Sequence, residues 1–259
     1  MAVKTIDFKR YSSIHIGPKI EVEVIDIIGN YNDYRIIGKA NNLLISNNPP
    51  PIAILGENFD YIIEKENKLI VGAATSSGKL LTYCKKHNIA DFEFLAKLPG
   101  TIGGLTKMNA GLKQWEIFNL IDGITTNKGT LTKDKVPHSY RSTKIDGIIF
   151  EVVFNINKTG YCKENQKKFT QMRDNQPNNP SAGSCFKNPE KQSAGYLLEQ
   201  SGLKGYRIGD MAFSDIHANF LVNLGNGTYE EAIELINIAK IKVNEKFNII
   251  LEIEIDIIN

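Results

Sequence analysis

The sequence predicts an α+β protein made of two parts. Short apolar strands, separated by turns rich in Asn, Pro and Gly, occupy the first part, and longer helical patterns begin after about residue 158. Alternation at period two is typical of half-buried strands, and apolar recurrence at helical spacing is typical of amphipathic helices. A chain of 259 residues can form one large domain or two smaller ones, each with its own core. Strands with interspersed helices favour the α+β class.

The strands of the first part are predicted from their alternation. Residues 20–27 alternate polar and apolar side chains, and four shorter apolar runs follow between turn residues, at 35–37, 52–55, 61–63 and 69–71. The polar run at 75–77 then opens a predicted helix that carries Leu80, Leu81 and Cys84 on one face.

The second part contains the strongest helix signal of the chain. Thr228 and Glu231 form a Thr-x-x-Glu capping box. Behind it, apolar residues recur at helical spacing, namely Ala232, Leu235, Ile236, Ala239 and Val243. Residues 251–258 alternate as a final strand, with Glu252, Glu254 and Asp256 on its polar face. The segment 175–180, rich in Pro and Asn, is a candidate hinge between the two parts.

Charge and hydropathy exclude several classes of function. Lys and Arg number 31 against 29 Asp and Glu, so the net charge of +2 gives no basic stripe for nucleic acid. No apolar run approaches the ~18 residues that span a bilayer, and the N-terminus lacks the apolar core of a signal peptide. We therefore expect a cytoplasmic protein with no nucleic-acid or membrane partner, and no protein partner is evident.

Three widely spaced cysteines predict neither a disulfide framework nor a metal site. No histidine lies near Cys185 in sequence to act as a base, so we interpret this residue as a small packing side chain.

Three runs of small residues carry the chemical signal. They are Gly38-Lys39-Ala40-Asn41-Asn42-Leu43-Leu44, Leu98-Pro99-Gly100-Thr101-Ile102-Gly103-Gly104 with Asn109 and Gly111 shortly after it, and Ser181-Ala182-Gly183-Ser184-Cys185-Phe186-Lys187-Asn188-Pro189. Glycine and alanine let the backbone approach a ligand closely, and consecutive N–H groups in such turns bind anions. The third run suits a serine hydroxyl held beside an anionic ligand. Neither a Rossmann fingerprint nor a Gly-Lys-Ser/Thr phosphate loop is present.

In this order, the three runs resemble the UDP-N-acetylenolpyruvoylglucosamine reductase family, flavin enzymes that make UDP-N-acetylmuramate for peptidoglycan. The resemblance extends from about residue 38 to the C-terminus, and Pro-Gly-Thr-x-Gly-Gly and Gly-Ser-x-Phe-Lys-Asn-Pro are specific in combination. It implies a PCMH-type (vanillyl-alcohol-oxidase-like) FAD-binding region at 1–157 and a smaller α+β substrate-binding domain at 158–259. The last strand, 250–259, would return to the flavin cleft. The short 148–161 connection suggests the form that lacks an extra substrate-clamping loop.

The resemblance also implies a role for particular residues. Arg141 would hold the enolpyruvyl carboxylate, Ser184 would donate the proton, and Glu254 would act with them as the third catalytic residue. The expected FAD-binding residues are Gly38, Lys39, Ala40, Asn41, Asn42, Leu43, Pro99, Gly100, Thr101, Gly103, Gly104, Asn109 and Gly111, and the expected substrate contacts are Tyr140, Gln176 and Asn188. FAD is the implied cofactor, and NADPH is the implied co-substrate.

The chain departs from the family pattern at two places. Ala40 stands where the family usually has glycine, and Ile216 stands where a lysine often contacts diphosphate. The assignment of Glu254 depends on the family's ending alone, because alternation makes Glu252 and Asp256 equally outward. Two other functions remain open, namely another FAD oxidoreductase acting on an alcohol or hydroxy acid, and a catalytically silent module that binds flavin or nucleotide sugar.

Overall fold

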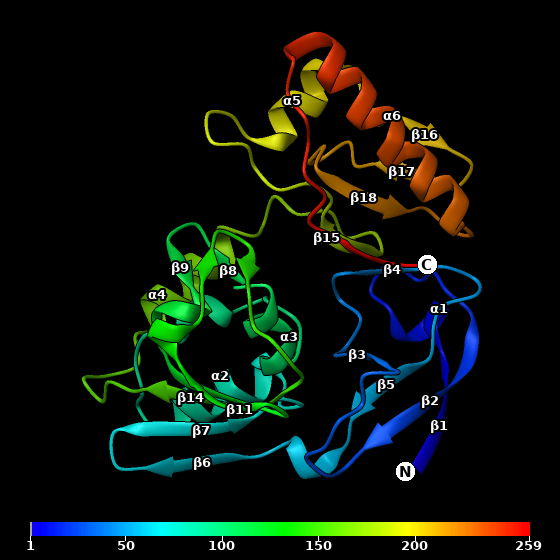
Figure 1. The fold of residues 1–259 in the computed structure, drawn as a ribbon. Coiled ribbons are helices and arrows are strands. Elements are labelled where there is room, and N and C mark those ends of the chain that lie inside the picture. The colour runs from blue at the N-terminus through cyan, green and yellow to red at the C-terminus, as the bar shows by residue number, and fades with distance from the viewer. Residues whose placement is uncertain (1) are drawn as a thin grey trace. The chain divides into compact units, whose positions relative to one another are not determined.

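The computed structural model describes residues 2–259 and divides them into two compact units. Of the described residues, unit 1 contains 2–4, 22–39 and 51–174, and unit 2 contains 5–21, 40–50 and 175–259. Both units combine sheet and helix, so the predicted α+β class is confirmed (Figure 1). The assignment of binding roles to 1–157 and 158–259 stays a prediction.

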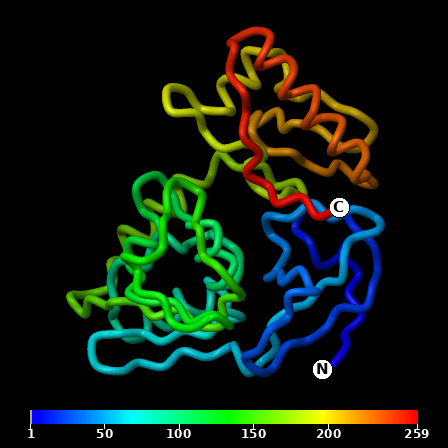
Figure 2. Tube along the Cα trace, viewed as in Figure 1, coloured from blue at the N-terminus to red at the C-terminus, as the bar shows by residue number. Residues whose placement is uncertain are grey.

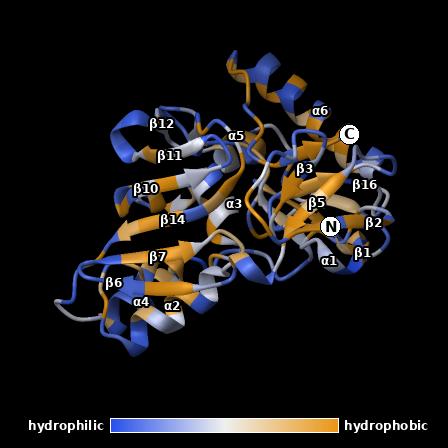
Figure 3. Ribbon diagram, turned by 60° about the horizontal axis from the view of Figure 1, so that its bottom comes forward, coloured by the Kyte–Doolittle hydropathy of each residue, from blue (hydrophilic) through white to orange (hydrophobic). Residues whose placement is uncertain are grey.

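A five-stranded antiparallel sheet forms the centre of unit 1, in the order β11-β10-β14-β7-β6. Its strands are β6 (Ile62–Lys65), β7 (Lys68–Gly72), β10 (Ile121–Thr126), β11 (Gly129–Thr132) and β14 (Ile149–Asn155). The helices are α2 (Ser77–Lys86), α3 (Ile102–Lys107) and α4 (Lys163–Gln171), with 3-10 turns η1 (Glu57–Phe59), η2 (Glu93–Leu95), η3 (Ile117–Asn119) and η4 (Lys133–Lys135). Two short hairpins complete it, β8 (Gly111–Leu112) with β9 (Trp115–Glu116) and β12 (His138–Ser139) with β13 (Ser142–Thr143). In Figure 3, β14 is coloured mainly hydrophobic, because it is largely buried, and α4 is coloured mainly hydrophilic, because it lies on the surface.

A second sheet, in the order β1-β2-β5-β3, contains the first strands of the chain. Its strands are β1 (Ala2–Asp7), β2 (Lys19–Ile25), β3 (Arg35–Ile37) and β5 (Ile52–Leu55), and the short helix α1 (Phe8–Tyr11) follows β1. β5 pairs in parallel with both β2 and β3. The strands predicted at 20–27, 35–37, 52–55, 61–63 and 69–71 are thereby confirmed, with ends that differ by one or two residues.

Unit 2 contains a four-stranded antiparallel sheet that the sequence did not predict, in the order β15-β18-β17-β16. Its strands are β15 (Ser181–Ser184), β16 (Arg207–Ile208), β17 (Met211–Phe213) and β18 (Phe220–Asn223), with helices α5 (Ala194–Gln200) and α6 (Tyr229–Phe247). The predicted capping box of α6 is confirmed, because Thr228 and Glu231 each accept the other's backbone N–H. The five predicted core residues of α6 are all buried.

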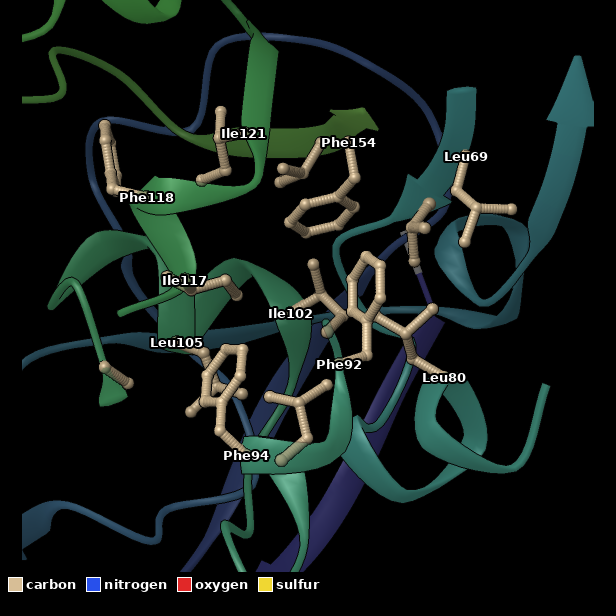
Figure 4. Close-up of a cluster of buried hydrophobic side chains, with 14 of the residues drawn as sticks. Leu69, Leu80, Phe92, Phe94, Ile102, Leu105, Ile117, Phe118, Ile121 and Phe154 are labelled. Carbon is tan, nitrogen blue, oxygen red and sulfur yellow. The ribbon is translucent and has the colours of Figure 1, made fainter. Parts of the chain in front are cut away.

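Each unit has its own apolar core. In unit 1, Leu80 and Cys84 of α2 are fully buried, as predicted, whereas Leu81 is only half-buried. The rings of Phe92 and Phe154 pack edge to face, with their centroids 5.5 Å apart, and Ile102 lies beside them (Figure 4). The core of unit 2 packs α5 and α6 on the four-stranded sheet and includes Cys185, which is fully buried. No helix among residues 2–259 has the length and apolar character that a bilayer crossing requires.

The prediction of one strand over 251–258 is wrong. Only β19 (Asp256–Ile258) is a regular strand, and it pairs in parallel with β4 (Leu43–Ile45). Residues 252–254 instead pair with residues 185–187 through the isolated bridge between Phe186 and Ile253. Figure 2 shows the red C-terminal trace passing along this segment. The segment divides its backbone hydrogen bonds between two partners, so neither ladder becomes long.

Candidate functional site

We call residues 181–186 the Ser184 turn. Backbone pairing holds this segment in place on both sides. Ser181 pairs with Val222 and Ser184 with Phe220, so β15 carries one extra residue between these two pairs. Such a bulge changes the direction of the side chain that follows it. Gly183 has φ of +88°, and a Cβ built on it would meet no atom within 4 Å. The bulge therefore leaves open space beside Ser184, where a ligand can approach the backbone.

Glu254 lies beside this turn, although it is 70 residues away in sequence. Its backbone N–H donates to the carbonyl of Cys185 over 2.9 Å. Its own carbonyl accepts from the side chain of Asn42 over 3.0 Å. Burial, and then the charge of Glu254, raise the pKa of the Cys185 thiol, which supports its interpretation as a packing residue. The structure thus places two predicted catalytic residues and one predicted FAD contact side by side in unit 2.

Asn219 holds the far side of the Ser184 turn. Its buried side chain accepts from the Phe186 N–H over 3.0 Å and donates to the Phe186 carbonyl over 2.8 Å. The Cys185 N–H donates to the Asn219 carbonyl over 2.7 Å. These bonds fix the backbone that follows Ser184, so the hydroxyl is presented from a rigid support.

Gly38, at the start of the first run, meets the second run in unit 1. A Cβ on Gly38 would lie 2.5 Å from Oγ1 of Thr101, and a Cβ on Gly103 would lie 2.9 Å from that of Ala73. Thr101 caps α3, because its Oγ1 accepts from the Gly104 N–H over 3.3 Å. The glycine at 38 therefore permits close packing of the two predicted FAD-binding segments, and the glycine at 103 permits close packing of α3 against Ala73.

Gly38→Ala is expected to destabilise the protein by about 1–3 kcal/mol, because the new methyl group forces Thr101 away from its capping position. Thermal or denaturant unfolding measures the loss. The same change in a Thr101→Ala background should cost less, since the clashing oxygen is gone. Gly78→Ala, in α2 and with no atom within 4 Å of the new Cβ, is the control and should not destabilise. Equal costs of Gly38→Ala in both backgrounds would refute this contact.

Arg141 is the centre of a second group of predicted residues, all in unit 1. Its side chain is 11% exposed, and its Nη2 donates to the Gly111 carbonyl over 2.8 Å. Its Nη1 donates to the Asn109 carbonyl over 3.4 Å and lies 3.5 Å from Oε1 of Glu116. The guanidinium carbon lies 4.8 Å from the ring centroid of Tyr140. Four residues predicted to bind FAD or substrate, or to act in catalysis, are thus in contact.

Glu116 is a candidate site residue that the sequence did not reveal. Its Oε2 accepts from Nδ2 of Asn109 over 2.8 Å, and the same amide donates to the Ser139 carbonyl over 2.9 Å. Both Asn109 (φ 47°) and Arg141 (φ 52°) adopt the left-handed conformation, which is uncommon outside glycine and clusters at functional sites. The carboxylate of Glu116 fixes the orientation of both side chains.

Arg173 was also missed. The residue is 8% exposed, and its Nε and Nη2 have no hydrogen-bond partner among residues 2–259. Burial, and then the charge of Arg141, lower the pKa of Arg173 to about 10, so the side chain stays charged at neutral pH.

The remaining predicted residues have varied surroundings. Ala40 is buried at φ 49°, a conformation that glycine adopts more easily, so the family's usual glycine would be unstrained there. Oδ1 of Asn188 accepts from the Ala194 N–H over 2.9 Å, which ties this side chain to the start of α5.

The other predicted residues differ in exposure. Gln176 is half-buried, and Ile216 is 54% exposed. Lys39 and Pro99 are exposed, whereas Leu43 is buried in β4.

Each unit by itself has features that suit a cofactor such as FAD, which carries both hydrogen-bond acceptors and hydrogen-bond donors. Among the described residues, Nε and Nη2 of Arg173 in unit 1 are buried without an acceptor, and Oδ1 of Asn41 in unit 2 is buried without a donor. Gly100 (φ 143°) and Gly183 lie in conformations that side chains rarely adopt. Unpaired buried polar atoms of this kind call for a ligand that satisfies them.

Known proteins resemble this chain over its whole length. Residues 176–258 match the family model described as UDP-N-acetylenolpyruvoylglucosamine reductase, C-terminal domain. Reductases of that name from Helicobacter hepaticus and Helicobacter pylori are 45% and 42% identical, each over the whole of both chains. The one from Campylobacter jejuni is 43% identical over 98% of this chain and 99% of its own.

A solved structure matches the complete fold. The UDP-N-acetylenolpyruvylglucosamine reductase of Thermus caldophilus aligns over 100% of both chains, with a TM-score of 0.84 and 28% sequence identity. Fold and comparisons together define a reductase that carries a distinct C-terminal domain. The particular family follows from the full-length relatives: this chain belongs to the UDP-N-acetylenolpyruvoylglucosamine reductase family.

Proposed function

We infer that this chain reduces UDP-N-acetylglucosamine enolpyruvate to UDP-N-acetylmuramate, with FAD as cofactor and NADPH as the electron donor. This reaction is a step of peptidoglycan synthesis, and a cytoplasmic location goes with it, because NADPH is a cytoplasmic reductant. Family membership supports the function. The structural observation that carries it is the backbone hydrogen bond that places Glu254 beside the Ser184 turn.

The proposed FAD site uses the two glycine runs. Residues 38–43 and 99–104 offer backbone N–H groups to the pyrophosphate, and Asn109 and Gly111 lie next to Arg141. For the substrate, we propose contacts from Tyr140, Gln176 and Asn188. Bound FAD supplies the hydride, which it obtains from NADPH.

The proposed residues act on the enolpyruvyl group. Hydride adds to the terminal vinyl carbon, the C=C π pair moves to the carbon that bears the ether oxygen, and the charge spreads into the adjacent carboxylate. Arg141 stabilises this charge where it develops. Ser184 then gives its hydroxyl proton to the same carbon, which completes the lactyl ether, and the hydroxyl is restored by a proton from water. Glu254, when protonated, donates a hydrogen bond to the group that carries the charge.

Purified protein should be yellow and contain one non-covalent FAD, which the absorbance spectrum and release of the flavin by heat will show. NADPH should bleach the flavin band, and addition of the enolpyruvyl substrate should restore it. Colourless protein that takes up no added FAD would contradict the proposal.

The same measurement discriminates the other two functions. An oxidoreductase for alcohols or hydroxy acids would be bleached by such a substrate in the absence of NADPH. A silent binding module would stay oxidised with NADPH, and it would tolerate the loss of Arg141, Ser184 and Glu254. The presence of all three in this chain favours the reductase.

A further inference from the structure

Arg173 follows α4, two residues after its last residue, and we place it on the side of this helix that contacts the β8–β9 hairpin. The ring of Phe169, one helical turn earlier, meets Trp115 edge to face at 4.9 Å. The helical backbone continues through Met172 (φ −61°, ψ −14°), so Phe169 and Arg173 share one face. Trp115 is followed directly by Glu116, the residue that holds Arg141. Arg173 therefore belongs to the same part of unit 1 as the Arg141 group.

The nearby carboxylates already have cations or amides as partners. Oδ1 of Asp174 lies 2.9 Å from Nζ of Lys97, and both side chains are more than half exposed. Glu116 is engaged by Arg141 and by Asn109. Neither acid forms a hydrogen bond or ion pair with Arg173, so the buried Nε and Nη2 of this charged guanidinium have no partner among residues 2–259. A buried charge without a partner is costly, which indicates that a ligand supplies the partner.

The unsatisfied atoms of Arg173 have a defined geometry. Nε–H and the nearer N–H of Nη2 point from the same edge of the planar guanidinium, and this edge is the one that binds a carboxylate bidentately. Both nitrogens lack a partner among residues 2–259. A lysine would offer a single ammonium charge here, whereas arginine offers two parallel N–H donors that match two acceptor atoms.

We propose that Arg173 binds an anionic edge with two adjacent acceptor atoms through its Nε–H and Nη2–H groups. The proposal rests on the proposed function, which provides two sources of this chemistry. One is the carboxylate of the enolpyruvyl substrate, and the other is the N1–C2=O edge of reduced FAD, which carries negative charge. Arg173 thus joins Arg141 as a second cation for anion binding in unit 1.

The test uses Arg173→Met and Arg173→Lys in the FAD-loaded enzyme. The Kd of UDP-N-acetylglucosamine enolpyruvate is measured by titration of the oxidised flavin spectrum, and the midpoint potential of FAD is measured without substrate. A lost charged hydrogen-bond pair is worth about 1.5–3 kcal/mol, or about 10- to 150-fold in Kd. Arg173→Met should either raise Kd by this factor, which identifies the substrate carboxylate, or lower the midpoint potential, which identifies reduced FAD. Arg173→Lys, which keeps the charge but not the fork, should show a smaller effect of the same kind.

Stability of the FAD-free protein separates this role from a structural one. Because Nε and Nη2 of Arg173 have no hydrogen-bond partner among residues 2–259, Arg173→Met should leave the Tm of FAD-free protein unchanged or higher. Lys168→Met, on the exposed side of α4, removes one charge and is the matched control for all three measurements. If both Kd and midpoint potential stay at wild-type values, the proposal is overturned, whatever happens to Tm; Arg173→Lys supplies this test if Arg173→Met does not fold. Failure of the wild-type protein to bind FAD would instead contradict the proposed function.

Discussion

Replacement of Ser184 by alanine will slow reduction of the enolpyruvyl substrate by about 10²–10⁴-fold, the usual cost of losing a positioned proton donor. NADPH will still reduce bound FAD at the wild-type rate, because that half-reaction does not use the hydroxyl. Ser184 is half-buried at the end of β15 and is not part of the apolar core, so the variant should fold normally. Stopped-flow absorbance of the flavin separates the two half-reactions.

Ser181→Ala is the matched control for this experiment. Ser181 lies in the same strand, and its Oγ accepts from the Gly183 N–H over 3.1 Å. Its loss removes this hydrogen bond and a longer one from Oγ to the Gly183 carbonyl, each worth about 1 kcal/mol of stability, without removing the proposed proton donor, Ser184. Both half-reactions should therefore stay close to wild type. If Ser184→Ala slows the two half-reactions equally, Ser184 is a structural residue and the assigned proton donor is wrong.

Long periodic elements could be predicted from the sequence, because their own residues determine them. Helix α6 has a capping box at Thr228 and apolar residues at helical spacing, and both features are local. Strand β2 alternates over seven residues. The strands β15–β18 contain two to four residues each, too few for a period to be visible, and β15 joins the sheet by pairing with β18, about 40 residues further along the chain.

The C-terminal segment shows how tertiary pairing overrides local pattern. Its alternation is real, since Leu251 and Ile255 are buried and Glu252 is exposed. The segment nevertheless pairs first with residues 185–187 and then with β4, two segments that alternation does not reveal. The path of residues 40–50, which join unit 2 while their neighbours join unit 1, is equally invisible in the sequence.

Some residues of the candidate site could be predicted from the sequence, and others could not. Glycine runs are visible in sequence because a missing side chain is a property of the residue itself, and the structure brings Gly38 to Thr101. Arg141 was found through its motif. Glu116 and Arg173 were missed because only the folded structure shows their surroundings. Glu116 contacts Arg141, and two buried nitrogens of Arg173 have no partner among the described residues.

Glu254→Gln will slow substrate reduction by about 10²–10³-fold, the usual cost of removing one group that stabilises developing charge. Glutamine keeps the size and an N–H donor, but it has no acidic proton to share with the enolate, so the hydrogen bond to the developing charge becomes weaker. The backbone hydrogen bonds of Glu254 to Cys185 and Asn42 do not involve the carboxylate, so the fold and FAD binding should be kept. Single-turnover oxidation of the reduced enzyme by the enolpyruvyl substrate measures the effect.

Glu252→Gln is the control, two residues away and with the same chemical change. Oε1 of Glu252 lies 2.5 Å from Nζ of Lys187, but its side chain is 71% exposed. An ion pair in such an exposed position is worth about 0–1 kcal/mol, so its loss should leave both half-reactions nearly unchanged. The two glutamates thus differ in surroundings rather than in chemistry, since one lies at the protein surface and the other is half-buried against the turn that carries Ser184. Equal, small effects of the two changes would reduce Glu254 to an ordinary surface carboxylate and remove the terminal segment from the catalytic mechanism.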